Sequence, residues 1–370
     1  MATSESDVER LRRLHDALVA RGRDLALYLV YERPKQVASR PALARVYFAE
    51  RCVSDDQLAR MIDAFRSIDA YVELFEGELP FLAALADGRL EQLGRDLQVA
   101  YNGIGFGITT GGFEPGRMAL VPSVCDAYGV LATNSDAYTC AIALHRFHSF
   151  VLLRAFGVAA PPVWHYRIGP GWMGERPPTG TKVIVKSTYE AWSVGVKDSS
   201  VFVVDNSCEQ RIAAIAEEIG QPVTLQAFVS GVEVCLPILA LPEPVLAPAV
   251  EQVLVGKAGD RDAIMTLDDN LTPGSYVYQP FDGAPETLHA MRRTALQVFD
   301  ILQQRALGRM DFRIGADGRP WLTDAAVTPG LSRASSTFAS LSQLGFDHAS
   351  FLRTVVAASV AATGRLTIAR

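Results

Sequence analysis

The stretch GRMDFRIGADGRPWLTDAAVTPG, residues 308–330, decides the fold of this chain. Its two halves, MDFRI and WLTDA, flank the turn sequence ADG, a pattern that predicts a β-hairpin. A hairpin here places Asp311 and Asp324 on neighbouring strands, and side-chain alternation places Arg309 on the same face as Asp311. Facing carboxylates suit Mg²⁺, and an arginine beside them can bind a phosphoryl group or an oxyanion. An ordinary surface ion pair is the alternative.

Two predicted strands upstream of the hairpin carry further candidate residues. Lys186 ends the run KVIVKS, and the turn SVG follows at residues 193–195, so the ammonium and the turn amides can bind nucleotide phosphates. The run LQAFVSGVE, residues 225–233, can pair its backbone with the edge of adenine, pack Phe228 on the base and bind ribose through Glu233. Each motif also has a plain structural interpretation, as a solvated lysine or as a strand with a core phenylalanine.

Strand and helix patterns alternate through the first 130 residues, which predicts an open α/β lobe. Apolar spacing and stop signals predict helices at residues 8–19, 56–66, 81–93, 141–156, 209–219 and 286–304, with two more at the end of the chain. Other strands are predicted at residues 25–31, 97–102, 200–205 and 233–241. The glycine-rich run at residues 102–112 does not open into a helix, so it favours a loop over a dinucleotide-binding turn.

Composition limits the classes of function. A chain of 370 residues fits two or three lobes, and a net charge of −6 gives no overall basis for binding nucleic acid or an anionic membrane. Five scattered cysteines without a CxxC pair favour a reducing cytoplasm over a disulfide framework or a structural zinc site. The N-terminus has no apolar signal core, and no apolar run is long enough to span a bilayer. His145 and His148 lie three residues apart on a predicted helix, which favours packing over zinc without a third ligand.

The order and spacing of these motifs resemble the ATP-grasp superfamily, and specifically its D-alanine–D-alanine ligases. Those ligases have a strand ending in lysine-proline and then E-G-S-S-V-G, where this chain has Lys186-Ser187 and then EAWSVG at residues 190–195. Their acid after S-G-x is Glu233 here, their G-R-x-D is GRMD at residues 308–311, and their P-G-M-T is PGLS at residues 329–332. The resemblance covers most of residues 97–355.

The resemblance implies an α/β, ATP-grasp fold of three parts. It implies an N-terminal open α/β lobe in residues 1–130, a central small α+β lobe in residues 131–222, and a C-terminal α+β lobe with an antiparallel sheet in residues 223–370 that holds the metal and catalytic site. Polar residues 260–274, rich in Asp and Gly, are the candidate lid over that site. A homodimer is the oligomeric state expected from the resemblance.

The same resemblance implies an ATP-dependent carboxylate–amine ligase with ATP and Mg²⁺ as cofactors and small-molecule carboxylate and amine substrates. A substrate carboxylate attacks the γ-phosphate of ATP, and an amine then attacks the acyl-phosphate. By position, nucleotide-binding roles fall on Arg146, Lys186, Glu190, Ser193, Gln226, Phe228, Val229 and Glu233, metal-binding roles on Asp311 and Asp324, and catalytic roles on Arg309, Gly330 and Ser335. Arg309 and the Gly330 amide would face the oxyanion, and Ser335 would lie near the carboxylate of the second substrate.

The chain departs from the family pattern at several positions, and its substrate contacts differ more than its nucleotide contacts. Ala326 replaces the family's third metal ligand, an asparagine, and Asp324 replaces a longer glutamate. Trp192 replaces a serine of the phosphate loop, Asn102 replaces a histidine, and Glu32 is only a loose counterpart of the N-terminal substrate-binding glutamate. We therefore expect an amide bond between amino acids, or between an unusual carboxylate and an amino acid, in specialised biosynthesis rather than between two D-alanines. A nucleotide-binding pseudoenzyme and a small-carboxylate kinase are the alternatives.

Overall fold

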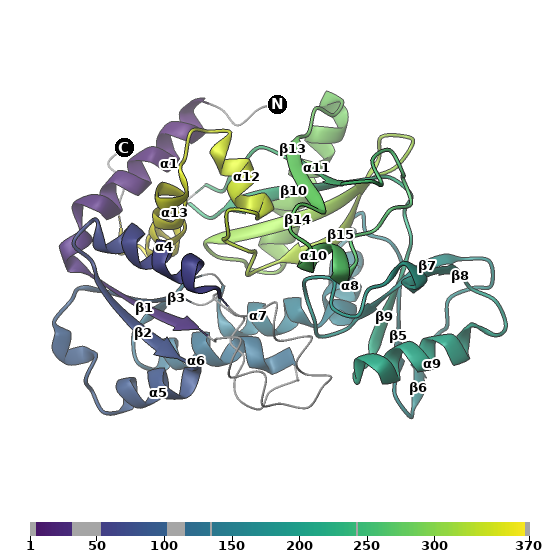
Figure 1. Cartoon of the computed structure of the whole chain (residues 1–370), viewed down its shortest axis with the longest axis horizontal. Helices are drawn as coiled ribbons and strands as arrows, with labels where there is room; N and C mark the ends of the chain where they lie inside the picture. Colours follow the sequence, from purple (N-terminus) through teal and green to yellow (C-terminus); the bar gives the residue numbers. More distant parts are fainter. Residues whose placement is uncertain (1–4, 32–52, 102–114, 134, 242, 367–370) are drawn as a thin grey trace.

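The computed structural model of the chain describes residues 5–31, 53–101, 115–133, 135–241 and 243–366. Its strands form three sheets, one from each successive part of the sequence, with helices packed on and between them (Figure 1). Among the described residues, no helix is both long and apolar enough to cross a membrane. Residues 32 and 102–112, on which two sequence interpretations fell, lie outside the described ranges.

The first sheet is parallel, with strand order β2-β1-β3-β4. It is built from α1 (Glu5–Ala20), β1 (Leu25–Tyr31), α4 (Asp55–Arg66), β2 (Tyr71–Glu76), α5 (Glu78–Ala86), β3 (Leu97–Tyr101), α6 (Leu120–Ala127) and β4 (Leu131–Ala132). All seven residues of β1 are buried, as expected for a central parallel strand covered on both faces. The strands predicted at residues 25–31 and 97–102 are confirmed, and β2 was not predicted. The helix predicted at residues 81–93 ends early, because Gly88 adopts a left-handed conformation with φ 71°.

Two helices, not one, connect the first sheet to the second. The prediction of a single helix at residues 141–156 is wrong, because α7 (Ala137–Leu144) and α8 (Arg146–Ala155) are separated at His145. The backbone of His145 leaves the helical region, with φ −78° and ψ 83°, and its ring caps α8 by accepting a hydrogen bond from the amide of His148. The break makes Arg146 the first residue of α8, and from there Arg146 lines the cavity described below.

The second sheet is antiparallel, with strand order β6-β5-β9-β7-β8. Its elements are β5 (Val163–Arg167), β6 (Gly171–Met173), β7 (Lys182–Ser187), β8 (Val201–Val203), α9 (Cys208–Ile219) and β9 (Val223–Ala227). The apolar side of α9 covers one face of this sheet through Ile212, Ala216 and Ile219. The lobe boundary predicted between residues 222 and 223 would cut β9 away from β5 and β7, so the pairing favours a boundary after Ala227.

The third sheet is also antiparallel, with strand order β13-β12-β10-β14-β15 and with β11 paired to β10. Its elements are β10 (Val232–Leu239), β11 (Val245–Leu246), β12 (Val250–Leu254), α10 (Leu267–Leu271), β13 (Tyr276–Pro280), α11 (Pro285–Ile301), β14 (Leu307–Ile314), β15 (Pro320–Ala326), α12 (Ser336–Ser342) and α13 (His348–Ala361). The predicted hairpin is confirmed as β14–β15. The two predicted final helices are also confirmed, and α13 packs against α1 and α4 in one core with the first sheet (Figure 1).

Candidate active site

A cavity of about 210 Å³ lies where the second and third sheets meet α7 and α8. Its lining comes from β7, β9, β10, β14 and β15 and from the loops at residues 190–193 and 327–336. All of the residues to which the resemblance assigned a role line this cavity, namely Arg146, Lys186, Glu190, Ser193, Gln226, Phe228, Val229, Glu233, Arg309, Asp311, Asp324, Gly330 and Ser335. The tertiary structure thus brings together residues that span nearly 190 positions of the sequence.

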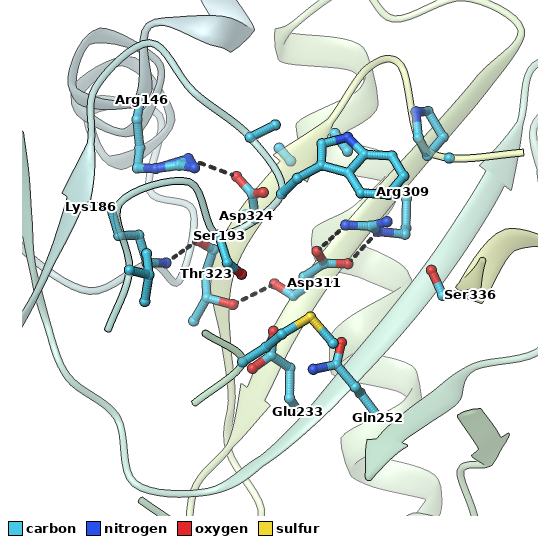
Figure 2. A pocket seen from close by; sticks show the side chains of 18 of the residues that line it. Arg146, Lys186, Ser193, Glu233, Gln252, Arg309, Asp311, Thr323, Asp324 and Ser336 are labelled. Carbon is cyan, nitrogen blue, oxygen red and sulfur yellow. Dashed lines mark hydrogen bonds and ion pairs between the residues drawn. The ribbon is translucent and has the colours of Figure 1, made fainter. Parts of the chain in front are cut away.

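The β14–β15 hairpin provides the two carboxylates. Asp311 and Asp324 lie on neighbouring strands as predicted, and an irregularity between Asp311 and Phe312 shifts the pairing by one residue so that the two aspartates are direct partners. Arg309 forms a two-point ion pair with Asp311, with Nε 2.7 Å from Oδ1 and Nη2 2.6 Å from Oδ2 (Figure 2). Burial raises the pKa of the Asp311 carboxyl, although Arg309 opposes the shift. The sequence left open an ordinary surface ion pair at this position. In the structure the Arg309–Asp311 pair is largely buried.

Asp324 has a different environment from Asp311. Its nearest cation is Arg146, with Nη1 3.3 Å from Oδ1, and its side chain keeps 34% of its surface exposed towards the cavity. Burial raises the pKa of Asp324, but the charges of Arg146, Lys186 and Arg309 outweigh it, so the net shift is downwards. Asp324 is therefore an anion that retains an open side for a ligand.

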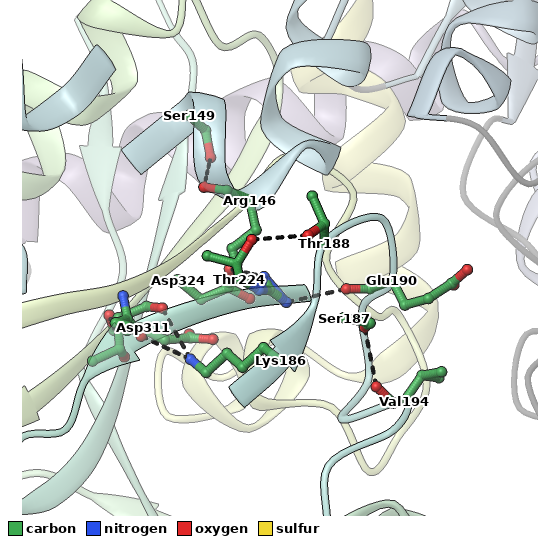
Figure 3. A network of polar contacts seen from close by, with 12 residues as sticks. Arg146, Ser149, Lys186, Ser187, Thr188, Glu190, Val194, Thr224, Asp311 and Asp324 are labelled. Atoms are coloured by element: carbon green, nitrogen blue, oxygen red, sulfur yellow. Dashed lines mark hydrogen bonds and ion pairs between the residues drawn. The ribbon is translucent and has the colours of Figure 1, made fainter. Parts of the chain in front are cut away.

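Lys186 lies at the end of β7, beside the two carboxylate strands (Figure 3). Its Nζ donates to Oε1 of Gln226 at 3.0 Å and to the carbonyl of Thr323 at 3.4 Å. Burial, and then the charge of Arg146, lower the pKa of Lys186 to about 8. Because an ammonium only donates, the amide oxygen of Gln226 must face it, and the buried Nε2 finds no partner among the described residues. That Nε2 is a fixed donor available to a ligand.

The segment that links β9 to β10, together with the start of β10, carries the remaining nucleotide candidates. The ring of Phe228 contacts two cations, with its centroid 4.8 Å from Nζ of Lys182 and 4.7 Å from Cζ of Arg313, and these contacts help to fix its orientation. Glu233 lies 3.9 Å from Nη1 of Arg313, and burial raises the pKa of its carboxyl against that attraction. Val229, which follows Phe228 in the sequence, also lines the cavity.

The loop after β7 is held by contacts that the sequence did not indicate. Oε2 of Glu190 is 3.1 Å from Nη2 of Arg117, with both side chains almost fully buried, and Oε1 accepts a hydrogen bond from Gln221 at 3.1 Å. Its carboxylate is thus engaged within the protein, while its carbonyl accepts from Arg146 at 3.1 Å (Figure 3). No local signal could have revealed Arg117, because it lies 73 residues before its partner.

Glycine is required at the end of this loop. Gly195 has φ 78°, and a Cβ there would lie 2.6 Å from Cδ1 of Ile219. Ser193 precedes it in the same left-handed region with φ 59°, and the hydroxyl of Ser187 holds the turn by donating to the carbonyl of Val194 (Figure 3). The turn predicted from SVG is confirmed, and its backbone lies at the cavity.

The two adjacent serines at the start of α12, the N-cap Ser335 and the first helical residue Ser336, differ in how their hydroxyls are used. Oγ of Ser335 caps α12 by accepting from the amide of Phe338 at 3.2 Å, and it donates to the carbonyl of Ser332 at 2.7 Å. Oγ of Ser336 is fully buried, lines the cavity and has no partner within the described ranges (Figure 2). The sequence comparison pointed to Ser335, whereas the unsatisfied hydroxyl belongs to Ser336.

The carboxylate pair fits a hard divalent cation. It offers oxygen donors on facing strands, and Asp324 is anionic with an open side. The described residues contain no group of three or more His, Cys, Asp or Glu placed to hold a metal, so water and phosphate oxygens would complete the coordination. His145 and His148 stack on each other with ring centroids 3.6 Å apart, which supports the packing interpretation of that pair.

Comparison with known proteins agrees with this geometry. The family described as "D-ala D-ala ligase C-terminus" matches residues 178–357. A D-alanine–D-alanine ligase of Xanthomonas axonopodis pv. citri is 25% identical over 306 residues, which cover 81% of this chain and 87% of the relative. A D-alanine–D-alanine ligase of Xylella fastidiosa is 26% identical over 244 residues, covering 65% and 76% of the two chains.

Structural similarity extends over nearly the whole chain. The crystal structure of D-alanine–D-alanine ligase from Bacillus anthracis complexed with ATP has a TM-score of 0.63 at 14% identity and covers 91% of this chain and 97% of that one. The predicted α/β, ATP-grasp fold is thus confirmed. In sequence, the chain is similar to D-alanine–D-alanine ligases, which are ATP-grasp ligases, as the motifs indicated.

Proposed function

We propose that this enzyme uses ATP to join a carboxylate to an amine through an acyl-phosphate, with substrates other than two D-alanines. The carboxylate oxygen would attack the γ-phosphorus and release ADP. The amine would then attack the acyl carbon, releasing phosphate and a proton to give the amide. The observation that carries this proposal is the set of facing carboxylates, Asp311 and Asp324, beside the partly buried cations Lys186 and Arg146.

We assign the nucleotide to the part of the cavity between β9, β10 and β7. Gln226, Phe228 and Val229 would contact the base, and Glu233 would accept hydrogen bonds from the ribose hydroxyls. Lys186 and Arg146 would neutralise the phosphates, with the backbone of Ser193 beside them. The engaged carboxylate of Glu190 supports a positioning role for this residue in holding the phosphate loop, rather than direct nucleotide contact.

Mg²⁺ would be held by Asp311 and Asp324, where it would neutralise charge on the phosphates. Arg309 already binds both oxygens of Asp311, so it keeps that carboxylate oriented towards β15. A guanidinium at this position, with the Gly330 amide across the cavity, would stabilise the developing oxyanion. Ser336, with its unsatisfied hydroxyl, is better placed than Ser335 to bind the carboxylate of the second substrate.

The test is ADP release with Mg²⁺–ATP across a panel of D- and L-amino acids, singly and in pairs, with product masses recorded. Release that requires a pair, with a product one water lighter than the sum, would establish the ligase and name its substrates. Two D-alanines giving the fastest turnover would refute the substrate part of the proposal while leaving the ligase chemistry intact.

A nucleotide-binding protein without turnover is the second candidate. Two observations favour it, the engagement of both Asp311 oxygens by Arg309 and the presence of Ala326 at the family's third ligand position. Calorimetric binding of ATP with no ADP release on any pair would support this reading. ADP release with one carboxylate and no amine would instead indicate a kinase of small carboxylates.

A further inference from the structure

Trp192 has an unusual backbone conformation inside the cavity. Its φ is 60°, in the left-handed region that a bulky side chain rarely adopts, so the surrounding contacts must hold it there. Its carbonyl accepts a hydrogen bond from Nδ2 of Asn270 at 2.8 Å, and Val194 donates to the carbonyl of Ala191 at 3.2 Å. Asn270 belongs to the segment predicted to be a lid, so this contact ties the phosphate loop to that segment.

This conformation brings the indole against the catalytic loop of the third sheet. A Cβ built on Gly330 would lie 3.1 Å from Cη2 and 3.2 Å from Cζ2 of Trp192, so no side chain fits at residue 330 without displacing the ring. The indole therefore covers the loop that follows Asp324 and Ala326. A substrate group at Gly330 would therefore lie beside the indole.

Apolar side chains continue from Trp192 to form one wall of the cavity. The wall has partly exposed members, Ala143, Leu144, Ala191 and Trp192. They pack against three buried residues, Met118, Cys140 and Val327. All seven line the cavity, and none carries a charge. Most of the charged groups described above lie on β7, β10, β14 and β15. The two that adjoin the wall, Arg146 and Glu190, are engaged within the protein, by Asp324 and by Arg117 and Gln221. A substrate group placed against the seven wall residues would therefore meet an apolar surface.

We infer that this wall is a specificity surface, which selects a substrate amino acid whose side chain is apolar and larger than a methyl group. The inference rests on the proposed ligase function and adds the class of side chain to it. Each methylene removed from water against such a wall improves binding by about fourfold. A hydroxyl or charge there would lose its water without gaining a partner, so it is rejected.

Valine and threonine provide the sharpest test, because they have nearly the same shape and differ in one hydroxyl. The measurement is calorimetric binding of D- and L-alanine, valine, threonine and leucine to the full chain, in the presence of Mg²⁺ and a non-hydrolysable ATP analogue. We expect one enantiomeric series to bind in the order leucine, valine, alanine, with valine at least about tenfold tighter than threonine. Equal binding of valine and threonine, or preference for alanine, would overturn the inference.

The variant Trp192→Ala should bind leucine and alanine within about threefold of each other, because the wall then loses its largest member. Trp321→Ala, which removes a tryptophan that packs on Arg319 away from the cavity, is the matched control and should keep the wild-type order. A larger leucine preference in Trp192→Ala would contradict the inference, because it would show that the indole occupies the space that the substrate side chain needs. Since binding is measured without turnover, an enzyme that binds valine selectively yet releases no ADP would refute the ligase function and not the specificity surface.

Discussion

The two ends of the cavity differ in whether their polar side chains already have hydrogen-bond or ion-pair partners within the protein. At the proposed nucleotide end the charged groups have partners within the protein: Lys186 bonds to Gln226, Arg146 to Asp324, and Arg309 to Asp311. At the proposed substrate end the surface is apolar around Trp192, and the buried hydroxyl of Ser336 has no partner in the described ranges. The first end is an electrostatic arrangement that exists before ligands bind, whereas the second is defined mainly by shape.

This difference explains why the family resemblance is stronger at one end than at the other. A triphosphate has the same charges in every ATP-grasp enzyme, so the cations and carboxylates that meet it are constrained. A substrate side chain can vary, and an apolar wall can be changed by one residue such as Trp192. Substitutions at the nucleotide end should therefore abolish turnover, and those at the substrate end should change preference.

The largest effect is expected from Asp311→Asn. It removes one of the two facing carboxylates and leaves Arg309 without its anionic partner, so turnover should fall on the order of 1,000-fold. ADP release is the measurement. Asp300→Asn, on an exposed position of α11, is the control and should match the wild type. Unchanged turnover in Asp311→Asn would remove Asp311 from the metal site.

Lys186 should give the next largest effect and a pH dependence. Its pKa is lowered to about 8, so it is cationic below that pH and loses its charge as the pH rises through it. The kcat/KM for ATP, which reports the free enzyme, should therefore fall about tenfold per pH unit above pH 8. Lys186→Met should lower kcat/KM by about 100-fold at pH 7 and abolish the alkaline decline.

The control for Lys186 is Lys197→Met, which removes an exposed lysine paired with Glu218. It should retain both the magnitude and the pH profile of the wild type. An alkaline decline that persists in Lys186→Met would assign the titration to another group.

Glu233→Gln should raise the KM for ATP by about tenfold with little change in kcat, because a charged acceptor of ribose hydroxyls becomes neutral. Steady-state kinetics with ATP and 2′-deoxy-ATP make the test specific. Wild type should discriminate between the two nucleotides, and the variant should do so less. Equal discrimination by Glu233→Gln and the exposed control Glu218→Gln would argue against ribose binding by Glu233.

The smallest effects are expected at the two serines that begin α12, and the two variants should differ in kind. Ser336→Ala should raise the KM of the amine substrate several-fold without changing thermal stability, because its hydroxyl has no protein partner in the part of the chain that the structure describes. Ser335→Ala should instead lower the free energy of unfolding by about 1 kcal/mol, since it removes the cap of α12. Ser342→Ala, on the exposed side of the same helix, controls for both. Reversed phenotypes for Ser335 and Ser336 would restore the role that the sequence assigned to Ser335.

Sequence patterns within a few residues predicted more of this structure than arguments about residues far apart in the chain. The strand at residues 25–31 and the hairpin at residues 307–326 follow from apolar runs and turn chemistry, which act over a few residues. The strands β2, β12 and β13 were not predicted, since β12 and β13 are polar and half-exposed in places and carry a weak apolar signal. The break at His145 was missed because its cause is a side-chain cap, not a glycine or proline.

The sequence by itself determined the resemblance to ATP-grasp ligases, the placement of Asp311 and Asp324 on neighbouring strands, and the shared strand face of Arg309 and Asp311, because side-chain alternation and a tight turn act over a few residues. Only the structure showed the irregularity between Asp311 and Phe312 that sets Asp311 directly opposite Asp324. Only the tertiary structure decided that Arg117 holds Glu190, that Trp192 covers Gly330, and that Ser336 rather than Ser335 keeps an unsatisfied hydroxyl. These are contacts and burial between segments far apart in the chain. Their energies depend on which atoms meet after folding, and that information is absent from any local pattern.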